Sequence, residues 1–294
     1  MNVDQSSLEN LFKGFKTNSN KSFEGAKSCH KTVSMVIPST TAEENYGWLG
    51  SLPSIREWIG NRIVHDLSIT SYQIKNRKFE LTVCVPREEI EDDQYGIFGP
   101  IMEKMGRDAA LHPDELVFSL LGKGFETGCF DGQYFFDSDH SILVDNKPVS
   151  VSNKQEGTGA AWYLVDCSQP LKPLIFQNRM PFSFTTPDNE RDHIVFFRDE
   201  YVYGGRGRSN AGLGLWQLSF ASKADLNREN YEAARKAMMN LKSDSGKPLG
   251  IIPTHLVVPA SHEGNGRRLL NALLSDGGTN EWAGSAELIV TPFL

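Results

Sequence analysis

The sequence lacks the patterns that would place the chain in a membrane or in a disulfide-bonded scaffold. Its uninterrupted apolar stretches, such as residues 194–197, fall far short of the ~20 residues needed to cross a bilayer. Only four cysteines occur in 294 residues, and no two are spaced as a CxxC pair. Isolated thiols of this kind are typical of a reducing compartment. The first residues also lack the charged and apolar regions of a signal peptide.

An excess of basic charge is missing as well. The 30 Lys and Arg residues are outnumbered by 37 Asp and Glu, which gives a net charge of −7. This balance argues against a dedicated DNA-wrapping protein, which needs a basic surface to displace counterions from phosphate. Residues 1–31 run the other way, with five lysines against three acidic residues, namely Lys13, Lys16, Lys21, Lys27 and Lys31 against Asp4, Glu9 and Glu24.

No sequence signature of an active site is present. Gly-x-Ser-x-Gly, His-Glu-x-x-His, the Walker lysine motif and GxGxxG are all missing. One segment carries metal-ligand residue types, namely Cys129, Asp131, Asp137, Asp139 and His140. A calcium loop would need further oxygen ligands at set positions, and a zinc site would need a second Cys or His pair. We therefore predict an Asx-rich turn whose carboxylates accept backbone amides.

Two further segments invite a functional interpretation. The glycine-rich run 204–214 contains Arg206 and Arg208, but it joins two strand-like segments and does not open a helix, so phosphate binding is disfavoured. We expect a strand-connecting turn whose arginines could meet a partner's carboxylates. The acidic run Glu88–Asp93 is expected to be solvated and to complement a helix N-terminus. The sequence thus predicts no catalytic, cofactor-binding or metal-binding residue and no cofactor.

The order of segments predicts an α+β protein. Residues 1–45 form an arm whose helical stripe ends at Gly14 and the polar run 17–22, and which must lie on its own body or on a neighbouring chain; the stripe is Leu8, Leu11, Phe12 and Phe15. Residues 46–92 predict a long β-hairpin around Asn76, with an exposed basic tip at Lys75, Arg77 and Lys78.

A long helix over about 98–122 follows, kinked near His112 because Pro113 disfavours the α conformation of the preceding residue. Residues 125–160 are rich in loops and residues 161–221 in strands. The chain from 223 to 294 then has α/β character.

Many short stretches together resemble the major head subunit (gpT) family of Mu-like phages and prophages, nearly from end to end. They include Tyr46-Gly-Trp-Leu-Gly, Lys75-Asn-Arg-Lys-Phe-Glu, Ile90-Glu-Asp-Asp-Gln-Tyr-Gly, His112-Pro-Asp-Glu-Leu-Val, Asp131-Gly-Gln-Tyr-Phe-Phe-Asp, Gly214-Leu-Trp-Gln-Leu and Leu256-Val-Val-Pro. The resemblance implies a structural capsid protein with the Hong Kong 97-type fold, not an enzyme. It would build hexamers and pentamers of an icosahedral shell around double-stranded DNA, in virions assembled in the host cytoplasm.

The resemblance also implies a division of the chain: an N-terminal arm (1–45), an extended loop (46–92), a peripheral domain with a spine helix (93–222) and an axial domain (223–294). In the usual order of the fold the axial region precedes the last peripheral strands, so the boundary at 222 departs from the pattern. A separate scaffolding protein, a portal and a decoration protein are the expected partners besides the chain itself. The absence of a long N-terminal extension suggests the separate scaffold and an untrimmed subunit.

Two other classes stay open on the sequence alone. The first is a nucleic-acid-binding module that uses the lysines of the arm and the Gly-Arg run, for which a salt-sensitive DNA shift would speak. The second is an enzyme whose site is assembled from scattered residues such as the 131–140 loop, which metal analysis would detect. For the capsid, we expect the basic hairpin tip to pair with an acidic surface of a neighbouring subunit, with Glu88–Asp93 as one candidate.

Overall fold

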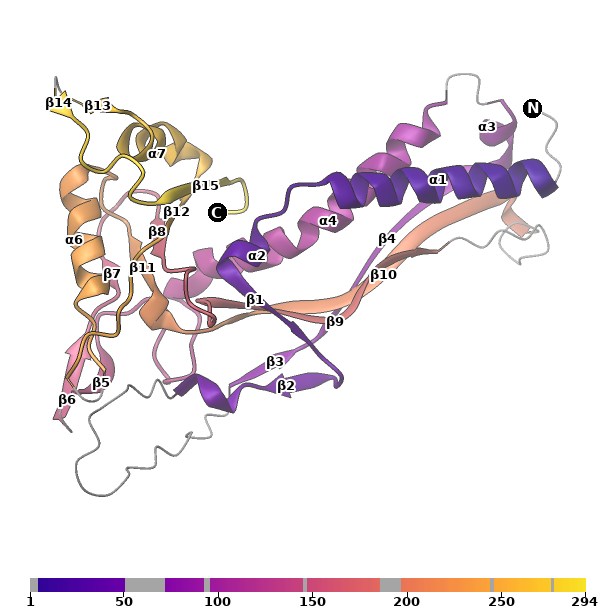
Figure 1. The fold of residues 1–294 in the computed structure, drawn as a ribbon. Coiled ribbons are helices and arrows are strands. Elements are labelled where there is room, and N and C mark those ends of the chain that lie inside the picture. The colour runs from indigo at the N-terminus through magenta and orange to yellow at the C-terminus, as the bar shows by residue number, and fades with distance from the viewer. Residues whose placement is uncertain are drawn as a thin grey trace.

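The computed structural model describes residues 5–50, 72–92, 96–144, 147–185, 197–243, 246–275 and 278–294. The molecule is elongated (Figure 1). One end holds a five-stranded sheet with helices α6 (Arg228–Met239) and α7 (Glu263–Leu270). The other is a long four-stranded sheet with helices α1 (Gln5–Gly25) and α4 (Phe98–Gly122) beside it.

The four-stranded sheet has the order β1-β9-β10-β4. Its central strands β9 (Leu174–Thr185) and β10 (Glu200–Leu213) pair antiparallel over most of their length. Strand β1 (Ser34–Pro38) adds to β9 in parallel, and β4 (Arg77–Pro86) adds to β10 antiparallel. The inward side chains of β10 include Tyr201 and Tyr203, which pack under α1 and α4.

Helix α4 confirms the predicted helix over 98–122 and runs continuously through Pro113. One face supplies apolar side chains to both hydrophobic cores. Met102 and Met105 belong to the smaller core below α1, whereas Val117 and Leu121 belong to the larger core around the five-stranded sheet. A single helix thereby connects the two parts of the molecule.

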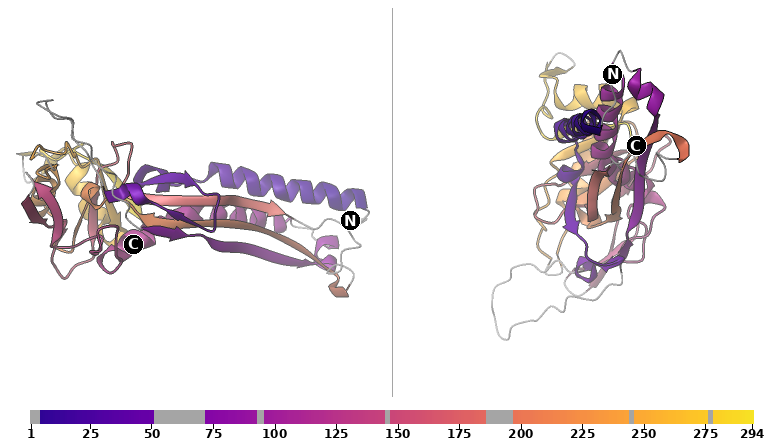
Figure 2. Two further views of the ribbon diagram at one scale, coloured as in Figure 1. Left: turned by 90° about the horizontal axis from the view of Figure 1, so that it is seen from below. Right: turned by 90° about the vertical axis from the view of Figure 1, so that its right-hand side faces the viewer.

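Helix α1 is longer than predicted, because neither Gly14 nor the polar run 17–22 ends it. Its stripe of Phe12, Phe15 and Ser19 lies against α4 and β10 of the same chain. Tertiary packing of one helical face outweighs the weak propensity of the polar residues, as is usual for helices in folded proteins. The arm was expected to lie either on its own chain or on a neighbouring one, and in the structure its helix α1 packs on its own chain (Figure 2).

The hairpin predicted around Asn76 does not form. Strand β3 (Gln73–Lys75) pairs with β2 (Glu43–Asn45), whereas β4 pairs with β10, so the chain passes at Asn76 from one sheet to another. The Asn76 side chain is half-buried at the crossing, where its Nδ2 donates to Thr41 O (2.8 Å) and its Oδ1 accepts from Gln177 Nε2 (2.8 Å). The predicted alternation on 79–85 is confirmed as a strand, but the first limb of the hairpin lies largely outside the described residues.

The glycine-rich run is the interior of β10 and not a strand-connecting turn. The glycines are needed because neighbouring groups come too close for a side chain. A Cβ at Gly212 would lie 2.0 Å from Ile74 Cδ1, and one at Gly205 would lie 2.4 Å from Phe182 Cε1. Glycine inside a strand often marks such close approach.

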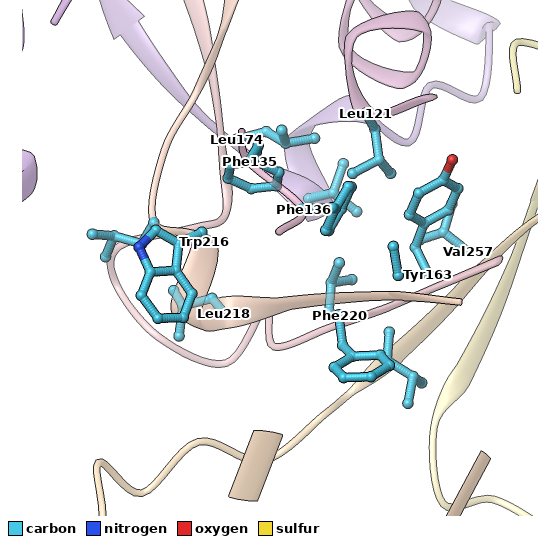
Figure 3. Close-up of a cluster of buried hydrophobic side chains, with 14 of the residues drawn as sticks. Leu121, Phe135, Phe136, Tyr163, Leu174, Trp216, Leu218, Phe220 and Val257 are labelled. Carbon is cyan, nitrogen blue, oxygen red and sulfur yellow. The ribbon is translucent and has the colours of Figure 1, made fainter. Parts of the chain in front are cut away.

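The five-stranded sheet has the order β15-β12-β8-β11-β7 and supplies many of the side chains of the larger core, part of which Figure 3 shows. Its strands are β15 (Glu287–Thr291), β12 (His255–Pro259), β8 (Trp162–Val165), β11 (Ser219–Ser222) and β7 (Lys154–Gln155). Residues from both sides of position 222 therefore share one sheet. The expected boundary at 222 does not coincide with the division between the two sheets.

The remaining elements are short. They are α2 (His30–Val33), α3 (Arg87–Glu91), β5 (His140–Val144), β6 (Lys147–Val151), β13 (Leu274–Ser275) and β14 (Gly278–Thr279), with single 3₁₀ turns at Gly47–Gly50, Lys123–Phe125, Trp216–Leu218 and Ala260–His262. Of the apolar stretch 194–197, residues 194–196 lie outside the described residues.

Candidate functional site

The metal-ligand residue types around Cys129 form a hydrogen-bonded turn, as predicted. Asp131 Oδ2 lies 2.7 Å from His140 Nδ1, and Asp131 Oδ1 accepts from Cys129 Sγ (3.0 Å) and from the Gln133 amide (3.1 Å). The carboxylate of Asp137 accepts from the amide of Ser138 (2.7 Å). Within the described residues, no group of three or more His, Cys, Asp or Glu is arranged to hold a metal ion.

The environment of this turn favours a fixed structure over reactivity. His140 is fully buried, and its ring stacks on Trp216 with centroids 3.9 Å apart and planes 10° apart. Burial strongly raises the pKa of the Cys129 thiol, which disfavours the nucleophilic thiolate. Burial alone would also raise the pKa of Asp131, but hydrogen bonds from His140 and Cys129 outweigh it and hold that pKa below its usual range. The turn thus fastens the segment after α4 to the larger core.

A second buried polar cluster, which sequence reasoning missed, ties the arm to α4. The Asp114 carboxylate accepts from Ser28 Oγ (2.6 Å) and from the amides of Cys29 (2.9 Å) and His30 (2.7 Å), the N-cap and the first residue of α2. Burial alone would raise the pKa of Asp114; the hydrogen bonds from the His30 ring, Ser28 and the amides hold it below its usual range. The sequence did contain a signal for this cluster: Asp114, directly after Pro113, is an acidic residue within the apolar stripe of a helix.

The charged segments lie at separate places on the long sheet. Glu88 and Glu89 are exposed, as expected, but they lie in the first turn of the short helix α3 and not at the N-terminus of the long helix α4, which they were expected to complement. Arg77 and Lys78 begin β4, and Lys75 ends β3, all three exposed. The two basic segments that were expected separately are neighbours, because Arg208 lies opposite Lys78 in the register of β10 and β4. The charged segments therefore form separate patches on the described surface.

Comparison with known proteins agrees with this picture. The family model of the Mu-like prophage major head subunit gpT matches residues 8–294. The chain belongs to this family. The major capsid protein of Escherichia phage Mu is 39% identical over 305 residues, with all of both chains covered. The FluMu prophage major head subunit of Haemophilus influenzae is 41% identical over 268 residues, covering 88% of this chain and 87% of the relative.

Solved structures extend the similarity to the whole fold. A subunit of the procapsid of bacteriophage JBD30 superimposes with a TM-score of 0.87 at 42% identity, covering 99% of this chain and 100% of that one. The JBD30 capsid decorated with minor capsid protein trimers gives a TM-score of 0.75 at 33% identity, covering 90% of both chains. The fold is the Hong Kong 97-like capsid fold, as expected.

Membership settles the class of protein. This Mu-like head subunit is a major capsid protein, a virion component of an icosahedral capsid, and its family is structural and not enzymatic. In the described part of the chain, no helix is long and apolar enough to cross a membrane.

Proposed function

We propose that copies of this head subunit associate into hexamers and pentamers, which tile an icosahedral shell around double-stranded DNA. The observation that carries the proposal is the agreement with the JBD30 procapsid subunit over practically the full length of both chains. The form of the molecule supports it. An elongated sheet with a helix alongside presents long lateral surfaces, and a closed shell needs the same surfaces used repeatedly in rings.

The parts of the fold receive roles within this proposal. Residues 1–45 are the N-terminal arm, 46–92 include the extended loop, and the long sheet with α4 is the peripheral domain. We place the axial domain around the five-stranded sheet, since β8 pairs with β12 of residues 223–294 and β11 pairs with β8. This changes the boundary expected at 222 and leaves β9 and β10 in the peripheral domain.

The further partners of the proposal are a separate scaffolding protein, a portal and a decoration protein. The JBD30 capsid carries trimers of a minor capsid protein, and a shell of similar subunits offers equivalent places for such trimers. Assembly would take place in the bacterial host cytoplasm.

Packaged DNA is expected to be tolerated and not gripped. Five lysines of residues 13–31 are the main local positive charge of an otherwise acidic chain. Lys13, Lys16 and Lys21 are exposed on α1. A few exposed lysines per subunit give weak, salt-dependent attraction to phosphate without sequence preference.

Electron microscopy of the purified full-length protein tests the proposal. We expect shells, tubes or hexamers, with sedimentation giving the mass of the assembled species. A protein that stays monomeric at high concentration yet shifts duplex DNA in a salt-sensitive manner would contradict the proposal and favour the nucleic-acid-binding alternative.

A further inference from the structure

The outer face of the long sheet, turned away from α1 and α4, carries a basic groove. Residues of β4 and β10 alternate between the two faces, and Lys78, Arg206 and Arg208 share the outer one. Together with Met180 and Glu80 they line a groove of about 440 Å³, which we call the basic groove. Three cations face one carboxylate there, so the groove is electropositive on a chain whose net charge is −7.

The cations of the basic groove have no partner within the described part of the chain. The side chains of Lys78, Arg206 and Arg208 make no hydrogen bond or ion pair with any described residue. Arg208 Nε is buried and unsatisfied, which is costly unless another group reaches it. The neighbouring Glu80 carboxylate is engaged by Thr82 Oγ1.

An acidic surface lies at the far end of the same strand. Glu88, Glu89 and Asp92 are exposed on and just after α3, and we call them the acidic tip. The neighbouring Arg87 amide donates to Asp199 O (3.0 Å), which holds α3 at the start of β10. None of the three carboxylates forms an ion pair with another described residue. Figure 1 shows α3 at the outer end of the sheet.

The two surfaces cannot meet within one chain. From Glu80, which lies opposite Arg206, to the end of β4 at Pro86 the strand rises about 20 Å, at about 3.3 Å per residue. This separation exceeds the reach of any side chain and two Debye lengths at physiological salt. Neither surface can therefore neutralise the other within one chain.

We infer that the acidic tip of one subunit docks in the basic groove of a second copy of this chain. The inference rests on the proposed function. One chain carries both complementary surfaces, displaced along one strand, which is the arrangement that head-to-tail association requires. A head-to-tail contact closes into a ring when its rotation permits, as a capsomer needs. DNA is the competing occupant of the groove, and the test separates the two.

The test uses two charge-reversed forms of the full-length protein. The groove variant carries Arg206→Glu and Arg208→Glu, and the tip variant carries Glu88→Arg and Glu89→Arg. Because both surfaces then bear the same sign in each variant, each alone should need about tenfold more protein for half-assembly at about 50 mM salt, with a smaller deficit at high salt. An equimolar mixture should associate, since each altered surface finds its complement on the other variant.

Circular dichroism and thermal unfolding establish that both variants fold. Arg267→Glu with Arg268→Glu on α7 is the charge-matched control, expected to behave like wild type. If the wild-type protein formed neither shells nor capsomers, the proposed function would be contradicted. The docking itself is tested separately, by sedimentation of the mixed variants. Unchanged assembly of either variant, or a mixture no better than its components, overturns the inference. So does a groove variant that assembles normally but loses affinity for duplex DNA, which would assign the groove to DNA.

Discussion

Substitution of Gly106 by Ala should separate α1 from α4. A Cβ at this position would lie 2.1 Å from the backbone oxygen of Ser19 and 2.8 Å from its carbonyl carbon. Backbone atoms of a packed helix cannot yield as the end of a side chain can, so α1 must move outward. The hydrogen bond from Ser19 Oγ to Met102 O, 2.9 Å long, would be lost with it.

The magnitude follows from three contributions. Replacing Gly by Ala within a helix favours folding by about 1 kcal/mol. Overpacking costs about 1–3 kcal/mol, and the lost hydrogen bond costs about 0.5–1.5 kcal/mol. We expect the free energy of unfolding of the unassembled subunit to fall by about 0.5–3.5 kcal/mol, as measured by denaturant unfolding. Hydrogen exchange and tryptic cleavage at Lys13 and Lys16 should increase.

Gly14→Ala on α1 is the matched control. No atom lies within 4 Å of the added Cβ, so the same chemical change should stabilise the helix by up to about 1 kcal/mol. A Gly106→Ala protein with wild-type stability and unchanged protection of residues 5–25 would refute the close crossing of the two helices.

Three further predictions concern pH, salt and DNA. Asp114→Asn should lower the free energy of unfolding by about 2–4 kcal/mol at pH 7. The folded pKa of Asp114 lies below its unfolded value, so the stability that the carboxylate adds to the wild type is present above pH ~4. In acid-unfolding curves, this difference between wild type and variant should shrink as pH falls through the folded pKa. Replacing Lys75, Arg77 and Lys78 by Glu should impair assembly more at low than at high salt, and light scattering that shows no salt dependence would argue against electrostatic docking at this site. Titration of the unassembled subunit with duplex DNA should show weak binding that vanishes near physiological salt, whereas tight binding with a steep salt slope would contradict the proposed tolerance of DNA.

Local patterns predicted single elements well, but not their partners. The apolar stripe of 98–122 is long, so the sequence predicts a helix over about these residues, and α4 confirms it although Pro113 does not end it. The alternation on 79–85 identifies a strand, yet nothing local reveals that its partner is β10, more than a hundred residues away. The hairpin around Asn76 was therefore a wrong interpretation of two genuine strands.

Residues whose purpose lies in distant contacts were the hardest to interpret. Glycines usually weaken a strand, and the reason for Gly205 and Gly212 appears only when Phe182 and Ile74 are placed against them. Likewise, the polar half of α1 is helical because it packs against α4, and the sequence of α1 alone does not reveal this contact. The Asp131 turn was predictable because its partners lie within ten residues.

Helix α4 spans the distance between the two cores, so a small rotation at one end becomes a larger displacement at the other. Its 25 residues are about 37 Å long at about 1.5 Å per residue. Both ends are clamped, one in the larger core by Val117 and Leu121 and the other in the smaller core by Phe98 and Met102. A tilt of about 5° at the end that Val117 and Leu121 hold would move the other end of the helix about 3 Å sideways. This shift exceeds the narrow range of donor–acceptor distances over which a hydrogen bond forms. In the proposed rings, small angular errors at the five-stranded sheet would thus grow along α4, so the stiffness of this helix would limit how precisely neighbouring subunits meet.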